Sequence, residues 1–559
     1  GPHGVRHEFE WNTWNYAGWT NDSITAFPAL TALAATWNPD MAARYGKAIG
    51  EEARYRKKDV LLGPGVNIYR TPLNGRNFEY MGEDPYLAGV MAVPYVKELQ
   101  KNGVAACVKH FALNNQEQWR GTVDVEVSDR ALYEIYLPAF KQAIVEGGAW
   151  SVMGAYNKYR GQHCCHNARL LNDILRDEWG FDGCVITDWG GAHDTKEAAL
   201  NGLDIEMGSY TNGLTSDNSL GYNLYYLADP YLEMLKKGEL PMASVDAKAR
   251  NILRLIFRTS LNQNKPYGSL CTKEHYDVAK VIGDESIVLL RNNGILPLQA
   301  DKYNRILVVG DNAVRRLTDG GGSSELKPKD MISPLDALRA LYGDKIEYTQ
   351  GYACGRPFFG HEEEMRQTVI DSLRAEAVAK ARQADVVIYV GGLNKNAFQD
   401  CESTDRKSYN LPFSQNELIE ELVAVNPNLV IANISGNAYA MPWLQKVPAI
   451  LHISYLGTMG GASIADVISG KVNPSGKLPY SFPVKLSDCL AHFFGEEAYP
   501  GIDTGKDDVS LTDYQRNVGV NPKEEYKDDI LVGYRWHDTK KIPALFSFGH
   551  GLSYTSFKY

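Results

Sequence analysis

Residues 183–191 read G-C-V-I-T-D-W-G-G and place one acid, Asp188, where an apolar run breaks into a glycine turn. A short apolar run bounded by turn residues is typical of a buried strand in a parallel sheet. A polar side chain at the end of such a strand can face a cavity, because the strand behind it holds its position. The stretch therefore predicts a buried strand that presents a carboxyl group at its carboxyl end.

Two apolar runs upstream have the same form. Residues 105–111 (A-A-C-V-K-H-F) carry Lys109 and His110 near their end, and residues 151–156 (S-V-M-G-A-Y) end in Tyr156. Amphipathic helix patterns lie between the runs, so the first half of the chain alternates strand and helix. Repeated βα units with polar residues at strand ends favour a (β/α) TIM-like barrel with one site at its carboxyl rim.

The other elements of the first half follow from hydrophobic periodicity and from glycine and proline positions. Including the runs above, we expect strands over residues 59–68, 105–110, 151–156, 184–187 and 203–207. Helices are expected over residues 85–102, 129–146, 167–179 and 243–259. The polar stretch 262–271 contains proline and glycine and predicts a linker.

A second βα pattern follows the linker. Its Val/Ile-rich runs, over residues 305–310, 384–391, 428–435 and 449–454, are what a parallel sheet covered on both faces requires. Helices are expected over residues 367–383 and 414–425. We therefore predict an α/β chain that consists of a barrel domain over 1–260 with an incomplete N-terminus, a linker over 261–280, an α/β sandwich domain over 281–487 and a loop-rich C-terminal extension over 488–559.

The composition excludes several classes of function. The net charge of −10 and the lack of a long basic run argue against nucleic acid or an anionic membrane as a partner. No run of 18 apolar residues predicts a membrane span. The eight scattered cysteines have the spacing neither of a disulfide framework nor of a metal site, so we expect no structural metal.

Hydrolysis of a glycosidic bond needs two carboxyl groups, one ionised and one that holds a proton. Asp188 suits the ionised role, because Lys109 and nearby arginines would lower its pKa. An Asp at a strand end is, however, more often a helix cap or an ion-pair partner. Spacing leaves the second acid open and favours a pair within the barrel. The candidates are Glu79, Glu83, Asp84, Glu117 and, in the second domain, Glu402.

Six motifs run in order through nearly the whole chain. They are G-P-G-V-N-I-Y-R-T-P-L-N-G-R-N-F-E-Y, K-H-F-A-L-N-N-Q-E, V-I-T-D-W-G-G, G-G-G-S-S, E-S-T-D-R-x-x-x-x-L-P and F-G-H-G-L-S-Y. Together they resemble glycoside hydrolase family 3. The resemblance implies a (β/α) barrel followed by an α/β sandwich, an active site between the two domains, and no cofactor or metal. It also implies retaining hydrolysis of β-glucosides or close relatives through a covalent glycosyl-enzyme.

The resemblance also assigns residues. Asp188 matches the family nucleophile, and Glu402 matches the acid/base that the second domain contributes. The residues that match the pocket for the non-reducing sugar are Arg6, Arg76, Lys109, His110, Arg120, Met153, Tyr156, Trp189 and Ser323. Cationic side chains give charge-assisted hydrogen bonds to hydroxyl groups, and an indole ring offers an apolar wall to a pyranose.

Three of these residues also have plain structural interpretations. Met153 can be core packing, and Ser323 can serve only its own backbone loop. Arg120 can pair with Glu117 or Asp124. The glycine-rich loop around Ser323 is not a phosphate-binding loop, because no Lys-Ser/Thr pair follows it.

The start of the chain departs from the family pattern. In the family, an Asp that contacts the sugar precedes the G-P-H-G-V-R run, whereas here Gly1 opens the sequence. We therefore expect a segment that carries this Asp to be missing from the sequence. The alternative is a protein whose sugar site is defective because it lacks this residue. Relatives also often continue beyond F-G-H-G-L-S-Y into a fibronectin-type domain.

The predicted function is that of a retaining exo-acting β-glucosidase, which removes non-reducing-end glucose from β-linked oligosaccharides or glucosides. A β-xylosidase of the same family is the near alternative, because one hydroxymethyl group separates the substrates. A non-catalytic glycan-binding relative would be expected to lose one of the two carboxyl groups. A nucleotide-dependent oxidoreductase is disfavoured, since no G-x-G-x-x-G follows the strand near Gly310. A homodimer is compatible with the sequence, as is a bacterial-type enzyme in the periplasm, outside the cell or in the cytoplasm.

Overall fold

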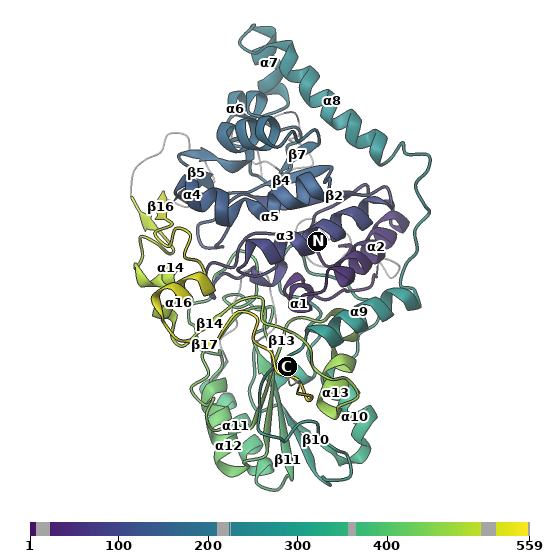
Figure 1. Cartoon of the computed structure of the whole chain (residues 1–559), viewed down its shortest axis with the longest axis vertical. Coiled ribbons are helices and arrows are strands. Elements are labelled where there is room, and N and C mark those ends of the chain that lie inside the picture. Colours follow the sequence, from purple (N-terminus) through teal and green to yellow (C-terminus); the bar gives the residue numbers. More distant parts are fainter. Residues whose placement is uncertain (7–22, 209–222, 224, 356–364, 505–520, 557–559) are drawn as a thin grey trace.

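The computed structural model describes residues 1–6, 23–208, 223, 225–355, 365–504 and 521–556. The last three residues of the expected C-terminal extension, and residues 505–520 within it, lie outside the described residues. The chain forms two α/β parts, one above the other in Figure 1, and its C-terminal segments lie along one side of the region where the two parts meet.

The first part is built on parallel strands that the apolar runs predicted. They pair in the order β1-β2-β4-β7, and their bounds are β1 (Val60–Leu61), β2 (Ala105–Phe111), β4 (Ser151–Gly154) and β7 (Cys184–Thr187). Every residue of β2, β4 and β7 is buried. Because all neighbouring strands run parallel, their carboxyl ends meet at one edge of the sheet.

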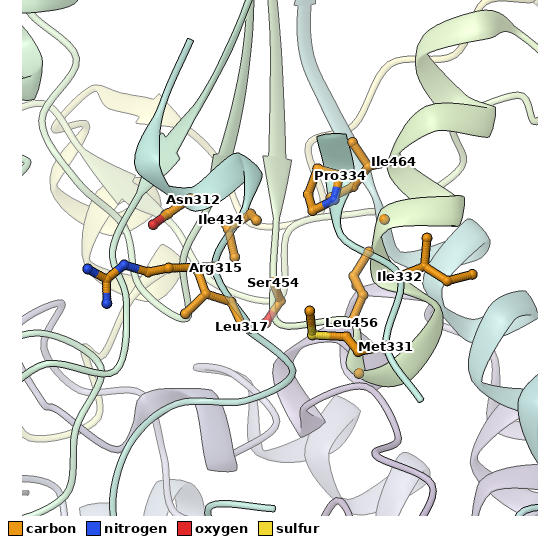
Figure 2. A pocket seen from close by; sticks show the side chains of 13 residues that line it. Asn312, Arg315, Leu317, Met331, Ile332, Pro334, Ile434, Ser454, Leu456 and Ile464 are labelled. Carbon is orange, nitrogen blue, oxygen red and sulfur yellow. The ribbon is translucent and has the colours of Figure 1, made fainter. Parts of the chain in front are cut away.

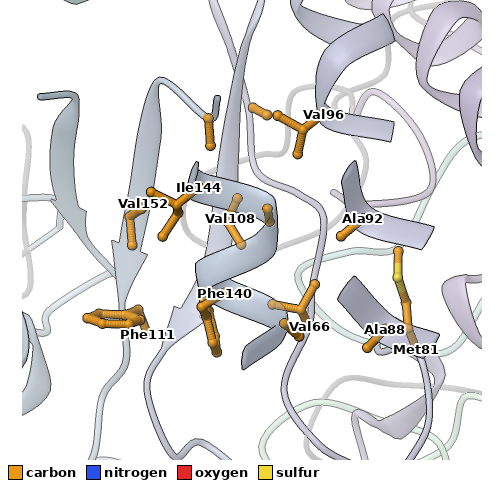
Figure 3. Packing of buried hydrophobic residues seen from close by; sticks show 14 of the residues in the cluster. Val66, Met81, Ala88, Ala92, Val96, Val108, Phe111, Phe140, Ile144 and Val152 are labelled. Carbon is orange, nitrogen blue, oxygen red and sulfur yellow. The ribbon is translucent and has the colours of Figure 1, made fainter. Parts of the chain in front are cut away.

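Helices cover this sheet. Helix α3 (Pro85–Gln100) is capped by Asp84, whose side chain accepts a hydrogen bond from Leu87 N–H. Pro85 is tolerated in the first turn, because an N–H at that position would have no partner within the helix. Figure 3 shows that α3 and the neighbouring α5 (Pro138–Lys141) turn apolar side chains toward the strands. Each large side chain buried in this way contributes about 1.5–3 kcal/mol relative to an exposed one.

Three expected elements of the first part differ from the prediction. The strand over residues 59–68 is reduced to β1, because Pro64 cannot donate to the ladder, and pairing returns only as the Gly65–Lys109 bridge. The strand over 203–207 is a single bridge from Ile205 to Ile186, because the Asp204 carboxylate takes the Val185 N–H.

The helix expected over residues 129–146 is interrupted. Pro138 has no N–H for an intrahelical bond, so the segment divides into short helical pieces. These are α4 (Asp129–Ala131), η2 (Leu132–Tyr136), α5 and η3 (Gln142–Glu146). The other predicted helices of the first part are present, with η5 at Arg169–Glu178 and α8 at Met242–Arg258. The sequence did not predict α1 (Leu30–Ala35), α2 (Pro39–Tyr55), α6 (Thr195–Leu200) or α7 (Asp229–Lys236).

The second part is a six-stranded sheet in the order β10-β9-β11-β12-β13-β8. The parallel strands are β9 (Ile306–Val309), β10 (Ile346–Thr349), β11 (Val386–Gly392), β12 (Leu429–Ile434) and β13 (Ala449–Ile453), and β8 (Val288–Asn292) joins β13 antiparallel. The sequence did not predict β8 or β10. The four Val/Ile-rich strands that it did predict are present.

Alternate residues of these strands pack against helices on opposite faces. One face meets α11 (Gln367–Ala381) and α12 (Gln415–Val425), and the other meets α10 (Pro334–Tyr342) and α13 (Gly460–Ser469). Figure 1 shows the two helix pairs on opposite sides of the sheet. This arrangement explains why the strands are apolar throughout, because neither face meets water.

The C-terminal segments bind to both parts. Strand β16 (Pro522–Glu525) pairs with β3 (Asp124–Glu126) of the first part, and β17 (Ala544–Phe546) pairs with β14 (Phe482–Pro483). Around β16 lies a buried charge cluster. Arg70 donates to Glu524 at 2.5 Å and to Asp528 at 2.6 Å.

We predict that Arg70→Met destabilises the protein by about 3–5 kcal/mol, because it removes the buried cation that pairs with the carboxyl groups of Glu524 and Asp528. Urea unfolding followed by tryptophan fluorescence measures the loss. Lys273→Met removes the exposed ion pair with Asp277 and serves as the control, with an expected effect of about 0.5 kcal/mol or less. Equal unfolding midpoints for the two variants would contradict this role of Arg70.

Candidate active site

The carboxyl ends of three neighbouring strands place polar side chains at one rim of the first sheet. Lys109 and His110 lie near the end of β2, Tyr156 lies in the loop after β4, and Asp188 follows β7 directly. The loop ends are held in register, since Asp188 N–H donates to the carbonyl of Gly154 at 3.3 Å. The three runs that predicted one site are therefore adjacent in the fold.

Asp188 is buried and has one engaged and one available carboxyl oxygen. Its Oδ1 accepts a hydrogen bond from Trp189 N–H at 2.9 Å. Its Oδ2 accepts no hydrogen bond of ordinary geometry from the described residues and lies 3.5 Å from Nε2 of His110. Burial, reinforced by the charges of Arg76 and Lys109, lowers the pKa of His110 well below its usual range, so the ring is neutral. Oδ2 is therefore the less engaged of the two carboxyl oxygens.

The expected direction of the Asp188 pKa shift is wrong. Burial raises the pKa of Asp188 above its ordinary value, even though Arg76 and Arg120 act in the opposite direction. The sequence shows which charges are close to the strand end, but it does not show how much water the second part removes from the carboxyl group. Here the loss of solvent outweighs the neighbouring cations.

Glu402 reaches the same site from the second part. It lies in the loop after β11, where its N–H donates to Gly321 O at 3.1 Å. Its Oε2 accepts from Ser323 N–H at 2.5 Å, and its Oε1 accepts from Arg120 Nη1 at 2.8 Å. Arg120 belongs to the first part, so this contact joins the two halves of the site.

The arginines decide the charge of Glu402. Burial by itself would raise the pKa of this carboxyl, but Arg76 and Arg120 outweigh burial and lower the pKa to about 2. Nη1 of Arg76 lies 3.8 Å from Oε1, and Arg120 lies closer. In this arrangement Glu402 is a carboxylate at any ordinary pH.

Glu79 is the main partner of the two most buried cations of the site, Arg76 and Lys109. Glu79 is fully buried and accepts two hydrogen bonds from Arg76, at 3.0 and 2.9 Å. Lys109 Nζ lies 3.1 Å from the same carboxylate, and Ser324 Oγ donates to it at 2.9 Å. Glu79 is therefore committed to holding the cations in place and is a poor candidate for the second acid.

The other residues of the predicted sugar pocket occupy different environments. Met153 packs in an apolar cluster with strand residues of the first sheet. Trp189 is 38% exposed at the mouth of the site, and Tyr156 carries the Arg120 guanidinium over its ring at 4.7 Å. Arg6 is half-buried. Their roles in sugar binding stay predictions.

Two further acids surround Glu402: Glu117, which the sequence predicted as a candidate second acid and as a partner of Arg120, and Asp405, which was not predicted as a site residue. Glu117 accepts from Arg120 Nη1 at 2.6 Å and from Ser403 N–H at 2.7 Å. Asp405 accepts from the N–H groups of Gly75, Glu117 and Gln118 at 3.0–3.1 Å and from Tyr499 Oη–H at 2.7 Å. The sequence signal for both is weak, because each lies in a polar loop rather than at the end of an apolar run.

The site is separate from the small crevice shown in Figure 2, which lies beside the carboxyl ends of β12 and β13. This crevice has a volume of about 20 Å³, enough for about one water molecule, and none of the predicted site residues lines it. Among the described residues, no group of three or more His, Cys, Asp or Glu side chains is arranged to hold a metal ion. No helix in the described ranges is long and apolar enough to cross a membrane.

Models of one known family match both parts of the chain that contribute to the site. The profile of the Glycosyl hydrolase family 3 N terminal domain matches residues 16–255, and that of the Glycosyl hydrolase family 3 C-terminal domain matches residues 287–554. The chain belongs to glycosyl hydrolase family 3. It is therefore a glycoside hydrolase, and the expected fold of a TIM-type barrel followed by an α/β sandwich is confirmed.

Several relatives cover the whole chain. Beta-glucosidase BoGH3A from Bacteroides ovatus is 63% identical, over 100% of this chain and 73% of that protein. An Exo-alpha-(1->6)-L-arabinopyranosidase from Bifidobacterium breve is 36% identical, over 100% of this chain and 68% of that protein. The solved structure of beta-glucosidase 3B from Thermotoga neapolitana in complex with glucose has a TM-score of 0.83 and 33% identity, over 100% of this chain and 75% of that one.

We predict that Gly322→Ala lowers the hydrolysis of an aryl glycoside roughly 10²-fold, because it displaces Glu402 by about 1 Å. A Cβ at position 322 would lie 2.3 Å from Cβ of Glu402, and the glycine has φ +112°. Gly343→Ala is the matched control: its φ is also positive, but its Cβ meets no atom within 4 Å. Steady-state kinetics on both variants checks this. An equal loss in both would show that backbone strain, not the contact with Glu402, causes the effect.

Proposed function

We propose that this family 3 enzyme is a retaining exo-acting β-glucosidase in which Asp188 is the nucleophile and Glu402 the acid/base. The observation that carries the proposal is that two buried carboxyl groups from different parts of the chain share the same arginine neighbours. Such a pair is what double displacement at an anomeric carbon needs. The 63% identity to a protein named as a beta-glucosidase supports glucose as the sugar.

Asp188 suits nucleophilic attack because its two oxygens have different surroundings. The hydrogen bond from Trp189 N–H to Oδ1 fixes the carboxyl plane, while Oδ2 remains available to bond to the anomeric carbon. Arg76 and Arg120 favour the ionised form that burial opposes. Attack by Oδ2 breaks the glycosidic bond and forms the glycosyl-enzyme ester.

Glu402 suits the proton-transfer role because it comes from the second part of the chain and lies close enough for its charge to act on Asp188. It gives its proton to the departing oxygen in the first step and takes a proton from water in the second. Both carboxyl groups act on Tyr156: burial followed by the charge of Asp188 raises the pKa of its hydroxyl well above the usual range, and Glu402 acts in the same direction. Tyr156 therefore stays a neutral hydrogen-bond donor throughout the cycle.

The cationic floor of the site suits a hydroxyl-rich ring. Lys109 and Arg76 present N–H donors that are already oriented by Glu79, so little side-chain entropy is lost when a sugar binds. Trp189 supplies a partly exposed ring at the mouth. A β-xyloside lacks only the hydroxymethyl group of a β-glucoside. An α-L-arabinopyranoside lacks this group too and has the opposite configuration at C4. Because the chain is 36% identical to an arabinopyranosidase, arabinose is the sugar to compare with glucose in an experiment.

We predict that incubation with a 2-deoxy-2-fluoro-β-glucoside of an activated phenol adds one fluoroglucosyl group to the protein, attached to the peptide that contains Asp188. Asp188→Asn should abolish this label and reduce turnover of an aryl β-glucoside by roughly 10⁴-fold or more, since it removes the nucleophile. Intact-protein mass spectrometry and peptide mapping provide the readout.

Asp182→Asn, at an exposed acid on the loop before β7, is the control and should label like the wild type. A label on another carboxyl would reassign the nucleophile. Labelling by the xylosyl or arabinosyl analogue, but not by the glucosyl one, would reject the glucose assignment and keep the retaining mechanism. An unlabelled protein with inversion of configuration in the product would overturn the retaining mechanism itself.

A further inference from the structure

One guanidinium nitrogen serves two carboxylates at the centre of the site. Nη1 of Arg120 donates to Glu402 Oε1 at 2.8 Å and to Glu117 Oε2 at 2.6 Å. We infer that Glu117 is a positioning residue that takes over Arg120 whenever Glu402 carries its catalytic proton. The inference rests on the proposed acid/base role of Glu402, and it assigns Glu117 no contact with the substrate.

In the proposed mechanism Glu402 must hold a proton that its surroundings disfavour. An acid must be protonated before it can donate a proton, yet Arg76 and Arg120 lower the pKa of Glu402 to about 2 despite its burial. Protonation therefore requires one of these cations to lose contact with Glu402. The structure indicates which of the two can do so.

Arg76 is held, whereas Arg120 has a second partner. Arg76 is 1% exposed and makes a two-point contact with Glu79, and its Nη1 is already 3.8 Å from Glu402. The Arg120 side chain is 17% exposed and lies over the Tyr156 ring. A small rotation of Arg120 weakens its bond to Glu402 and keeps its bond to Glu117, so no buried cation is left without a partner.

Glu117 is itself held by the loop that carries Glu402. Its side chain is 1% exposed, and its Oε2 accepts from Ser403 N–H at 2.7 Å. Its own N–H donates to the Asp405 carboxylate at 3.0 Å. Glu117 is therefore fixed relative to Glu402 by two residues of the Glu402 loop, Ser403 and Asp405. A carboxylate fixed in this way is a stable alternative partner for Arg120.

The charges around Glu117 suit an exchange of Arg120 between Glu117 and Glu402. Burial raises its pKa to about 7, with Arg120 and Arg76 acting downward and Glu402 and Asp405 acting upward. The Tyr80 hydroxyl, whose pKa is raised first by burial, also faces this carboxyl. A group that ionises near neutrality can pair with Arg120 when Glu402 is neutral and release it when Glu402 is charged.

The proton balance follows the two chemical steps. When Glu402 gives its proton to the departing oxygen it becomes a carboxylate, and Arg120 moves toward it. When water attacks the glycosyl-enzyme, its proton goes to Glu402, which becomes neutral, and Arg120 returns to Glu117. The ester bond to Asp188 that forms in the first step is broken by water in the second, so the net change is hydrolysis of one glycosidic bond, with no proton or electron gained or lost over the cycle.

The test is Glu117→Gln, which keeps an acceptor for Ser403 N–H but removes the charge. Without that charge Arg120 pairs with Glu402 alone and a like charge disappears; both changes lower the pKa of Glu402. The descending limb of kcat/KM against pH should therefore move to lower pH by roughly one unit. At pH 7, kcat/KM should fall about ten-fold for cellobiose, whose leaving group needs an acid, and less than about two-fold for 2,4-dinitrophenyl β-glucoside, whose leaving group does not.

Glu117→Asp keeps the charge and should restore the wild-type ratio between the two substrates. Glu134→Gln removes an exposed carboxylate that accepts from Arg130 and should change neither the ratio nor the pH limb. Circular dichroism checks that each variant is folded. If Glu117→Gln does not fold, the substrate ratio of Glu117→Asp decides: a ratio far from that of the wild type overturns the inference.

The outcomes separate the inference from the proposed function. An equal loss on both substrates with an unchanged pH limb would show that Glu117 is only structural and would overturn the inference. A wild-type protein that hydrolyses neither substrate would overturn the proposed function instead. Activity of the wild type on the dinitrophenyl glucoside, together with a selective loss of cellobiose hydrolysis in Glu117→Gln, supports both.

Discussion

The two halves of the active site depend on the Asp405 carboxylate. It lies in the second part of the chain and accepts hydrogen bonds from Gly75, Glu117 and Gln118 of the first part and from Tyr499 of the C-terminal segments. Four donors around this buried carboxyl group compensate part of its loss of water, although burial still raises its pKa, and they leave its loop little freedom to move. Because Glu402 lies three residues before Asp405, this contact also determines where the acid/base candidate sits.

The same principle holds the C-terminal segments against the first part. Glu83 accepts from Ser481 N–H and Oγ–H and from Tyr534 N–H, so one carboxyl group joins three parts of the chain. Arg70 joins the C-terminal segments through Glu524 and Asp528. Buried polar contacts of this kind add little net stability compared with apolar packing, but they tolerate few alternative arrangements. These polar contacts lie beside apolar packing, because Tyr69 and Phe78 of the first part belong to the two apolar clusters of the second sheet.

The electrostatics of the site follow from this enclosure. Arg76, Lys109 and Arg120 are gathered in a volume from which most water is removed, and Glu79, Glu117 and Glu402 balance them. Burial and neighbouring charge act in opposite directions on each carboxyl group, so small differences in distance decide which group is ionised. This is why Glu117 and Glu402, which share one arginine nitrogen, have pKa values of about 7 and about 2.

The sequence by itself determined the strands and the place of Asp188. The apolar runs that form β2, β4, β7, β9, β11, β12 and β13 are local signals, since a strand buried on both faces must be apolar along its length. Asp188, Lys109 and Tyr156 were predictable for the same reason, because each stands at the end of such a run. Spacing alone did not identify Glu402, which was assigned from the resemblance to glycoside hydrolase family 3. Only the tertiary structure decided that Arg120 is shared by Glu117 and Glu402, that β16 pairs with β3, and that burial raises the pKa of Asp188. These features depend on contacts between segments far apart in the chain and on the exclusion of water, and neither leaves a periodic trace in the sequence.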